Sequence, residues 1–343
     1  MGDILHALPA VTALRQTHPC WVIDWVVEPR WSALLAAEGS TGRGVTRCDM
    51  APNPAQPLVD QIHWAATKQW RKAPFSAQTR HEIKTLRQAL QDGNYDVTID
   101  LQGAIRSAVV GSFAGSRRRI GEEEPREGAA RWFFTDLIAT RGAHVIEQDV
   151  ELAASIAGDD LHPVQPWLPV DLAAEAWADG ISPEGGKPAV LINPGAGWGA
   201  KCWPVERYAA VAQDLIHRGF CVLINVGPGE EPLADAIIQS TNGAVVPLHC
   251  SLAQLIAISR RLALMIGGDT GPLHLACALG RPVVGIYGPT DPSRNGPYGT
   301  RFRVLRSPES RRDHSRKKEP EAGLLTIQPE DVLRAADELL SLG

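Results

Sequence analysis

Residues 262–292 constrain the fold of this chain most, because they encode a strand, a turn, a helix and a second strand in succession. The apolar run 262–266 is followed by two glycines and then Asp269, which stands where a helix N-cap is expected. Pro272 suits the first turn of a helix that Gly280 ends, and another apolar run follows. We therefore predict a β-α-β unit whose exposed helix N-terminus suits an anionic group such as phosphate.

A strand-glycine-aspartate-helix joint also occurs as a purely structural turn, in which the aspartate is only a cap. Here the joint carries more than that minimum. Thr270 and Gly271 follow the aspartate, His274 lies one turn into the helix, and residues 288–292 form a second loop rich in glycine and proline. This combination favours a binding site for a phosphorylated ligand.

Length and composition limit the class of protein. A chain of 343 residues exceeds the size of one growing core and predicts two domains. Its apolar content of 44% and charged content of 21% are typical of a soluble globular protein, and a net charge of -5 argues against nucleic acid as a partner. The six cysteines are scattered and no apolar run reaches membrane-spanning length, so we expect a cytoplasmic protein with free thiols.

The order of expected elements indicates parallel sheets. Apolar strands alternate with amphipathic helices throughout, which is typical of an α/β architecture. Residues 158–170 contain three prolines and little periodicity, as in an interdomain linker, and the strand pattern restarts at 189–193.

Three loops follow apolar strands in the second half, at 194–201, 227–231 and 268–271. They lack the GxxxxGK and GxGxxG spacings, which disfavours kinase-type P-loop and dinucleotide-dehydrogenase interpretations. If they converge, Lys201 and backbone amides would bind phosphates and a carboxylate would bind ribose hydroxyls. The alternatives are a surface lysine and, for Glu230 and Glu231, the start of a solvated helix.

Several segments resemble one family in order along nearly the whole chain. They are Met1-Gly2-Asp3-Ile4-Leu5-His6-Ala7-Leu8-Pro9, Asp100-Leu101-Gln102-Gly103 with Arg106-Ser107, Arg126-Glu127-Gly128, Lys201-Cys202-Trp203-Pro204, Gly268-Asp269-Thr270-Gly271-Pro272-Leu273-His274 and Gly288-Pro289-Thr290-Asp291-Pro292. Together they resemble glycosyltransferase family 9, the ADP-heptose:lipopolysaccharide heptosyltransferases. Trp70-Arg71-Lys72 and the opening segment look most like the heptosyltransferase I branch.

The resemblance implies a GT-B fold, with two Rossmann-like domains whose parallel sheets face a central cleft. Residues 1–165 would bind the acceptor, 166–325 would bind the nucleotide sugar, and 326–343 would form a helix crossing back toward the N-terminal domain. The implied reaction is an inverting, metal-independent transfer of heptose from ADP-L-glycero-D-manno-heptose to the Kdo region of lipid A in the lipopolysaccharide inner core. The ADP-sugar is a substrate, so no cofactor is expected. A monomer peripheral to the inner membrane would meet this acceptor.

The family's motifs also imply site residues. Asp3 matches the proposed general base, which takes the proton of the acceptor hydroxyl. Lys201 and the N–H groups at 270–271 would bind the diphosphate. Asp269 would orient the loop or contact the sugar, and His274 would contact the phosphate side of the donor. Of the two adjacent glutamates, Glu231 matches the ribose-binding carboxylate better by spacing. The full implied donor set is Gly197, Lys201, Glu230, Glu231, Asp269, Thr270, Gly271, Pro272 and His274.

An acceptor that carries carboxylates and phosphates calls for basic residues in the first domain. Residues 68–87 contain six Lys and Arg against one acid, Glu82. Such a run is often only a solvated helix face, but the matched motifs favour acceptor binding here. Trp70 could pack in the core or stack on sugar. A second basic run at 311–318 suits anionic lipid head groups or a solvated loop equally well. The implied acceptor set is His6, Lys68, Arg71, Lys72, Gln102, Arg106 and Arg126.

One departure from the family concerns the start of the chain. Family members usually place a strand before the Gly-Asp pair, whereas Met1 here precedes Gly2-Asp3 directly. We therefore expect an N-terminal domain that apparently lacks its first strand, with Asp3 near a terminus. This leaves two alternatives beside the main hypothesis: a family 9 transferase with another acceptor or donor, and a non-catalytic GT-B-like binding protein. A sugar-nucleotide epimerase is weaker, because it would not explain Lys68–Lys72.

Overall fold

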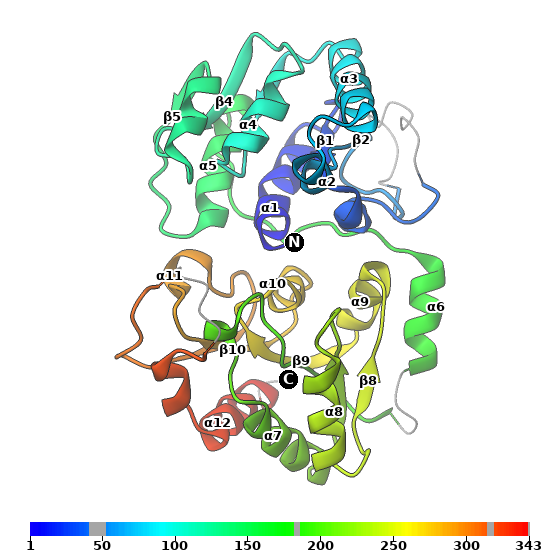
Figure 1. The fold of residues 1–343 in the computed structure, drawn as a ribbon, viewed down its shortest axis with the longest axis vertical. Coiled ribbons are helices and arrows are strands. Elements are labelled where there is room, and N and C mark those ends of the chain that lie inside the picture. The colour runs from blue at the N-terminus through cyan, green and yellow to red at the C-terminus, as the bar shows by residue number, and fades with distance from the viewer. Residues whose placement is uncertain (41–52, 182–185, 314–318, 342–343) are drawn as a thin grey trace. The chain divides into compact units, whose positions relative to one another are not determined.

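The computed structural model describes residues 1–40, 53–181, 186–313 and 319–341 (Figure 1). The chain divides into two compact units, with the boundary between Val170 and Asp171. The proline-containing stretch that we expected to be a linker ends at this boundary and contains no regular structure after Gly158. Each unit is described by itself below.

The N-terminal unit alternates helices with short strands. Its helices are α1 (Gly2–Thr17), α2 (Thr67–Lys72), α3 (Ala77–Asp92), α4 (Ile105–Ser112) and α5 (Val145–Ala157), with 3-10 turns η1 (Pro29–Leu34) and η3 (Gly128–Phe133). Its strands are β1 (Asp24–Val27), β2 (Gln61–Trp64), β3 (Val97–Ile99), β4 (Arg118–Glu122) and β5 (Asp136–Ile138). All pairs are parallel, and within the described residues they form two sheets, β1-β2 and β3-β4-β5.

Helix α1 is buried along most of its length because its sequence is largely apolar. Ala10, Ala13 and Leu14 pack against α5. Arg15 is buried in the same helix, where its guanidinium pairs with Asp60 at 2.5 Å and donates to the carbonyl of Leu58 at 3.0 Å. Such pairing is what allows a charge to lie inside a core. The result is a fixed helix that carries Asp3 in its first turn.

The C-terminal unit is built on a six-stranded sheet. Its strands are β6 (Ala189–Asn193), β7 (Cys221–Asn225), β8 (Val246–Leu248), β9 (Leu262–Gly268), β10 (Val283–Tyr287) and β11 (Phe302–Arg306). Its helices are α6 (Leu172–Ile181), α7 (Val205–His217), α8 (Glu231–Ser240), α9 (Leu252–Ser259), α10 (Gly271–Ala278), α11 (Pro292–Asn295) and α12 (Pro329–Leu340), with 3-10 turns η5 (Gly199–Lys201) and η6 (Ala322–Thr326). Every strand pair is parallel, which confirms the α/β prediction.

The strand order β11-β10-β9-β6-β7-β8 positions the predicted loops. Strand β6 lies between β7 and β9, so the chain first adds strands on one side of β6 and then on the other. The loops after β6, β7 and β9 therefore leave three adjacent strands at their carboxyl ends. A ligand crevice is expected where the strand order reverses, and here that point lies between β6 and β9.

The last helix belongs to the C-terminal unit. Val332, Ala335, Ala336 and Leu339 recur at helical spacing, and this stripe lies in the same core as β6, β7, β9, β10 and α7. The resemblance implied a helix crossing back toward the N-terminal domain. Within the C-terminal unit, α12 packs on α7 and on strands β9, β10 and β11, where its apolar face is covered. The crossing toward the N-terminal domain stays a prediction.

Candidate functional site

The carboxylate of Asp269 organises the loop after β9. It forms an ion pair with Nζ of Lys201, which follows β6, and its Oδ1 lies 3.0 Å from Nε2 of His274 on α10. The side chains of Lys201 and Asp269 are each 11% exposed. Because β6 and β9 are neighbours, residues 68 positions apart meet at the point where the strand order reverses.

Electrostatics hold the carboxylate of Asp269 in its charged form. Burial alone would raise the pKa of Asp269, but the hydrogen bond from His274 and the charges of His274 and Lys201 outweigh it and hold the pKa well below its usual range. The ammonium of Lys201 also lies 4.3 Å from the ring centroid of Trp198, a cation–π contact. An anionic ligand here would meet a lysine that is already oriented.

The N-cap of α10 is Thr270, and the expectation that Asp269 caps this helix is wrong. Asp269 turns toward Lys201 and His274 instead. Among the described residues, the side chain of Thr270 makes no capping hydrogen bond at the amino end of α10, where Gly271 and Pro272 open the helix. Exposed N–H groups at such an end are suited to an anion.

Two asparagines that the sequence interpretation missed connect the three loops. Asn193 ends β6, and its Nδ2 donates to the carbonyl of Gly195 at 2.8 Å and lies 3.5 Å from Oγ1 of Thr270. Asn225 ends β7 and donates to Oδ1 of Asn193 at 2.6 Å. The signal was present, since both strands are apolar runs that end in asparagine.

The two adjacent glutamates at the start of α8 differ in environment. Glu230 is half-buried, and its Oε2 accepts from the N–H of Gly227 at 3.0 Å. A Cβ on Gly195 would lie 1.9 Å from this carboxylate, so a larger residue there would displace the side chain of Glu230. Burial raises the pKa of Glu230, whereas backbone hydrogen bonding lowers the pKa of the exposed Glu231. Gly197, also predicted for the donor, is exposed in the loop after β6.

In the N-terminal unit, Asp3 lies in the first turn of α1 beside two other predicted residues. Its Oδ2 accepts from Nε2 of Gln102 at 2.7 Å and lies 3.4 Å from NH1 of Arg126. The carboxylate is half-exposed, and no described residue donates a hydrogen bond to its Oδ1. One oxygen is thus held by polar neighbours while the other is open to a substrate hydroxyl.

Asp100 positions Gln102, and sequence reasoning gave it no role. Its buried carboxylate accepts from the N–H groups of Gln102 and Gly103 at 2.8 and 3.1 Å and from the hydroxyl of Ser107 at 2.8 Å. Gly103 has a φ of +63°, and a Cβ there would lie 2.9 Å from the backbone nitrogen of Arg126. The Asp-Leu-Gln-Gly motif therefore needs its glycine for both reasons.

The segment that carries Arg126 is tied to the same loop. The N–H of Glu127 donates to the carbonyl of Gly103 at 2.9 Å, and Oε2 of Glu127 accepts from the N–H of Ile105 at 2.8 Å. These bonds bring the 100–107 and 126–128 motifs together. Asp3, Gln102 and Arg126 consequently form one cluster from three separate parts of the sequence.

The other predicted acceptor residues lie in different settings. His6 is buried, and its ring is edge-on to His144 with centroids 5.8 Å apart. Arg106 is exposed on α4, and Lys68, Arg71 and Lys72 are exposed on α2.

Of the two interpretations of Trp70, packing in the core is correct, since it lies in a core cluster with Leu86 and Leu90. In the second basic run, Arg311 and Arg312 are exposed and residues 314–318 lie outside the described residues.

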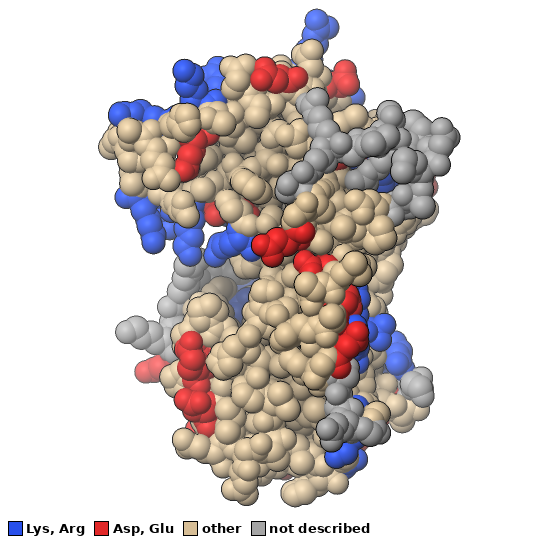
Figure 2. Space-filling model, turned by 90° about the vertical axis from the view of Figure 1, so that its right-hand side faces the viewer, with Lys and Arg blue, Asp and Glu red and all other residues tan. Residues whose placement is uncertain are grey.

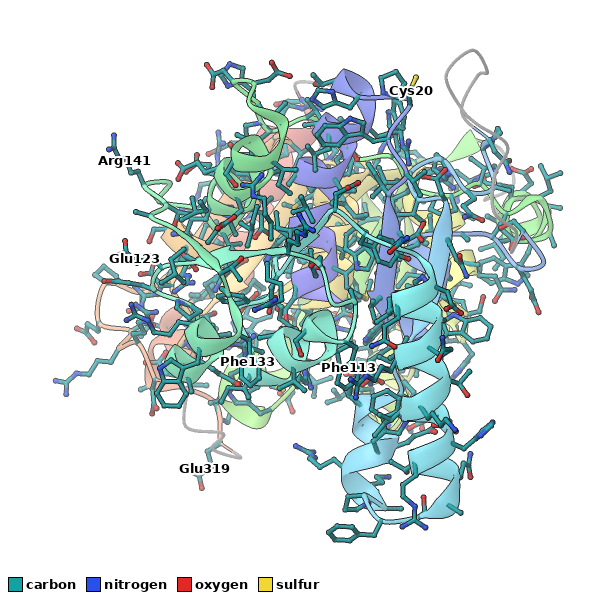
Figure 3. All side chains as sticks on the ribbon, turned by 90° about the horizontal axis from the view of Figure 1, so that it is seen from above. Cys20, Phe113, Glu123, Phe133, Arg141 and Glu319 are labelled. Carbon is teal, nitrogen blue, oxygen red and sulfur yellow. The ribbon has the colours of Figure 1, made fainter. Side chains whose placement is uncertain are left out.

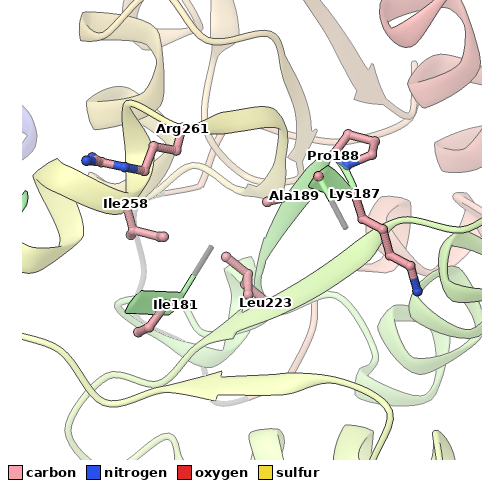
Figure 4. Close-up of a pocket in the computed structure, with 8 residues that line it drawn as sticks. Ile181, Lys187, Pro188, Ala189, Leu223, Ile258 and Arg261 are labelled. Carbon is pink, nitrogen blue, oxygen red and sulfur yellow. The ribbon is translucent and has the colours of Figure 1, made fainter. Parts of the chain in front are cut away.

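The C-terminal unit has a pocket of about 280 Å³ whose lining does not include Lys201, Asp269 or His274 (Figure 4). It is lined by Lys187, Pro188 and Ala189 at the amino end of β6 together with Ile258 and Arg261. It contains none of the predicted residues. Within the described ranges, no group of three or more His, Cys, Asp or Glu lies together as a metal site, and no helix is long and apolar enough to cross a membrane.

Comparison with known proteins places this chain in a family. The model of glycosyltransferase family 9 (heptosyltransferase) matches residues 83–325. Lipopolysaccharide heptosyltransferase 1 of Escherichia coli K12 is 30% identical over 314 residues, covering 90% of this chain and 91% of the relative.

Solved structures agree with this match. The E. coli heptosyltransferase WaaC with ADP is 28% identical, with a TM-score of 0.78 over 99% of this chain and 97% of that one. WaaC with ADP-2-deoxy-2-fluoro heptose is also 28% identical, with a TM-score of 0.76 over 98% of this chain and 96% of that one. The predicted GT-B fold is thereby confirmed. The chain is a glycosyltransferase that belongs to family 9, the heptosyltransferases.

Proposed function

We propose that this protein transfers heptose from ADP-L-glycero-D-manno-heptose to the Kdo region of lipid A during assembly of the lipopolysaccharide inner core. The observation that carries the proposal is the Lys201–Asp269–His274 cluster beside the open amino end of α10. A paired lysine and free helix N–H groups are suited to a diphosphate. The relatives named as lipopolysaccharide heptosyltransferases, and WaaC with ADP, support heptose and ADP as the donor components.

In the proposed mechanism the C-terminal unit stabilises the leaving group. When the bond between the anomeric carbon and the diphosphate oxygen breaks, negative charge grows on ADP. Lys201 and the N–H groups at the start of α10 are fixed before the reaction, so they stabilise this charge at little reorganisation cost. We propose that they supply the positive charge for departure of ADP without a metal ion.

The N-terminal unit is proposed to activate the acceptor. A Kdo hydroxyl donates its proton to the open Oδ1 of Asp3 while its oxygen attacks the anomeric carbon. The new C–O bond forms on the face opposite the departing ADP, which inverts the configuration in one displacement. Gln102 and Arg126 position Asp3 through its other oxygen. Lys68, Arg71, Lys72 and Arg106 are proposed to meet the acidic groups of the acceptor.

Purified protein tests this function directly. Incubation with ADP-heptose and Kdo-lipid A is expected to release ADP and increase the mass of the acceptor by one heptose, as read by mass spectrometry. A panel of other nucleotide sugars and of acceptors without Kdo serves as the control. Turnover with another pair alone would reassign the substrates within family 9, and ADP-heptose binding without turnover on any acceptor would favour a binding protein.

We also propose that Glu231 binds the ribose hydroxyls of ADP, because it is exposed and ionised beside the loop after β7. Glu231→Gln is expected to raise the Kd for ADP by about tenfold or more, since hydrogen bonds to charged groups contribute about 1.5–3 kcal/mol. Isothermal titration calorimetry measures this effect.

Glu230→Gln is the matched control for that measurement. It keeps the oxygen that accepts from Gly227 and should leave the Kd for ADP nearly unchanged. A larger loss in Glu230→Gln than in Glu231→Gln would exchange the roles of the two residues.

The proposed acceptor indicates where the protein works. Because Kdo-lipid A is a membrane lipid, we propose that the protein acts at the inner face of the cytoplasmic membrane. We also propose that it acts as a monomer. With no membrane-spanning helix among the described residues, this contact would be peripheral.

A further inference from the structure

Helices α2 and α3 are joined by the short segment 73–76, and in Figure 3 these light blue and cyan helices project together from the N-terminal unit. Phe75 in this turn is 85% exposed. The N–H of Ser76 donates to the carbonyl of Ala73 at 3.2 Å, and Pro74 occupies the second position of the turn, where its fixed φ is favourable. Phe75 therefore lies exposed in the turn between the two helices.

Contacts of Trp70 hold helices α2 and α3 together. Trp70 of α2 packs against Leu86 and Leu90 of α3, and its Nε1 donates to Oε2 of Glu82 at 2.7 Å. Gln78 donates to the other oxygen of Glu82 at 2.9 Å. The single acid in this segment is therefore occupied by neutral donors and pairs with none of the nearby bases.

The two helices on either side of Phe75 carry exposed basic side chains. Arg80, Lys84 and Arg87 recur at helical spacing along α3, next to its buried stripe. Together with three bases on α2 they form a set of exposed cations, none of which pairs with an acid in the described part of the chain: Lys68, Arg71, Lys72, Arg80, Lys84 and Arg87. Lys and Arg side chains gather along one edge of the N-terminal unit in Figure 2. We call Phe75 and these six side chains the α2–α3 tip.

We propose that the α2–α3 tip docks the protein on the anionic surface of a lipid bilayer, with Phe75 inserted among the head groups. An exposed apolar side chain between two helices that carry cations unpaired among the described residues matches a surface that is negatively charged outside and apolar beneath. In a protein with a net charge of -5, this local excess of positive charge also fixes which part of the molecule approaches the membrane.

This inference rests on the proposed function, in that a membrane-lipid acceptor gives the enzyme a reason to dock. The bases of α2 take part in docking and are also proposed to reach the acceptor's own acidic groups, whereas Phe75 and the bases of α3 contact only the lipid surface. Docking should therefore occur on vesicles that contain no acceptor.

Vesicle co-sedimentation of the full chain tests the proposal. The protein is expected to bind vesicles of phosphatidylcholine with phosphatidylglycerol and not vesicles of phosphatidylcholine alone, and added salt should weaken this binding. Phe75→Ser should lower the partition coefficient about tenfold or more through lost apolar burial. Arg80→Ser and Lys84→Ser should each lower it about fivefold.

Leu172→Ser is the matched control. Leu172 is 81% exposed, but it stands beside Asp171 and Glu175, so an anionic bilayer has no reason to approach it. This variant should bind vesicles as the unchanged protein does. Equal binding by the Phe75→Ser variant, an equal loss in Leu172→Ser, or binding only to vesicles that contain the acceptor would overturn the proposal.

Turnover separates this proposal from the proposed function. On an acceptor whose acyl chains have been removed, Phe75→Ser should keep the full rate, while on acceptor embedded in anionic vesicles it should be slower. If the unchanged protein transfers no heptose to either acceptor yet binds anionic vesicles through Phe75, the proposed function fails and the docking surface stands.

Discussion

Asp3→Asn is expected to lower kcat for heptose transfer by about 10²–10⁴-fold, the range that a positioned general base contributes. The asparagine has the same shape and keeps an oxygen for the hydrogen bond from Gln102, but it cannot take the proton of the acceptor hydroxyl. The Kd for ADP should not change, since the proposed ADP contacts come from the C-terminal unit. Single-turnover kinetics and calorimetry with ADP measure the two quantities separately.

Two further variants distinguish chemistry from structure at this position. Gln102→Ala removes the neighbour that holds Oδ2 of Asp3 and should reduce kcat less than Asp3→Asn does, because the base itself remains. Arg118→Ala is a matched surface control, since it breaks an exposed pair with Asp136 outside the cluster. Full turnover in Asp3→Asn would show that Asp3 is not the general base. The proposed stabilisation of the leaving group would then still be tested by the Lys201 variants.

Local pattern was sufficient to predict strands β6, β7, β9 and β10 of the C-terminal unit, but not the strands β8 and β11. Apolar runs that end in glycine or asparagine identify β6, β7 and β9, and the residues that follow them form the loops that were expected. What pattern could not show is the pairing of Lys201 with Asp269. That contact depends on β6 lying next to β9, a strand order that only long-range packing decides.

Side chains with two plausible environments were the other limit. Trp70 lies within a basic stretch and could stack on sugar, but packing against Leu86 and Leu90 buries it. Asp100 belonged to a matched motif, yet its task of holding Gln102 and Gly103 emerges only from backbone geometry. Asp269 is next to a helix start, and its ion pair with Lys201 outcompetes capping. In each case the tertiary contact overrides a sound local expectation.

Lys201→Ala is expected to lower kcat by about 10²–10³-fold, the loss typical of removing one preorganised group from a site where charge develops. The Kd for ADP should rise by about tenfold, because the ammonium also contacts the bound diphosphate in the proposal. Lys201→Arg keeps the charge and should recover part of the rate, although a guanidinium has a different shape and reach.

This substitution also removes the ammonium that pairs with the carboxylate of Asp269, so a loss of activity would be compatible with a damaged loop. The Lys201→Ala, Asp269→Asn double variant resolves this, because it removes both charges of a nearly buried pair together. Its Tm should lie closer to that of the unchanged protein than the Tm of Lys201→Ala does, while its kcat stays low. A double variant that regains both Tm and kcat would show that Lys201 only neutralises Asp269, and the stabilisation of the leaving diphosphate would then fall to the amino end of α10.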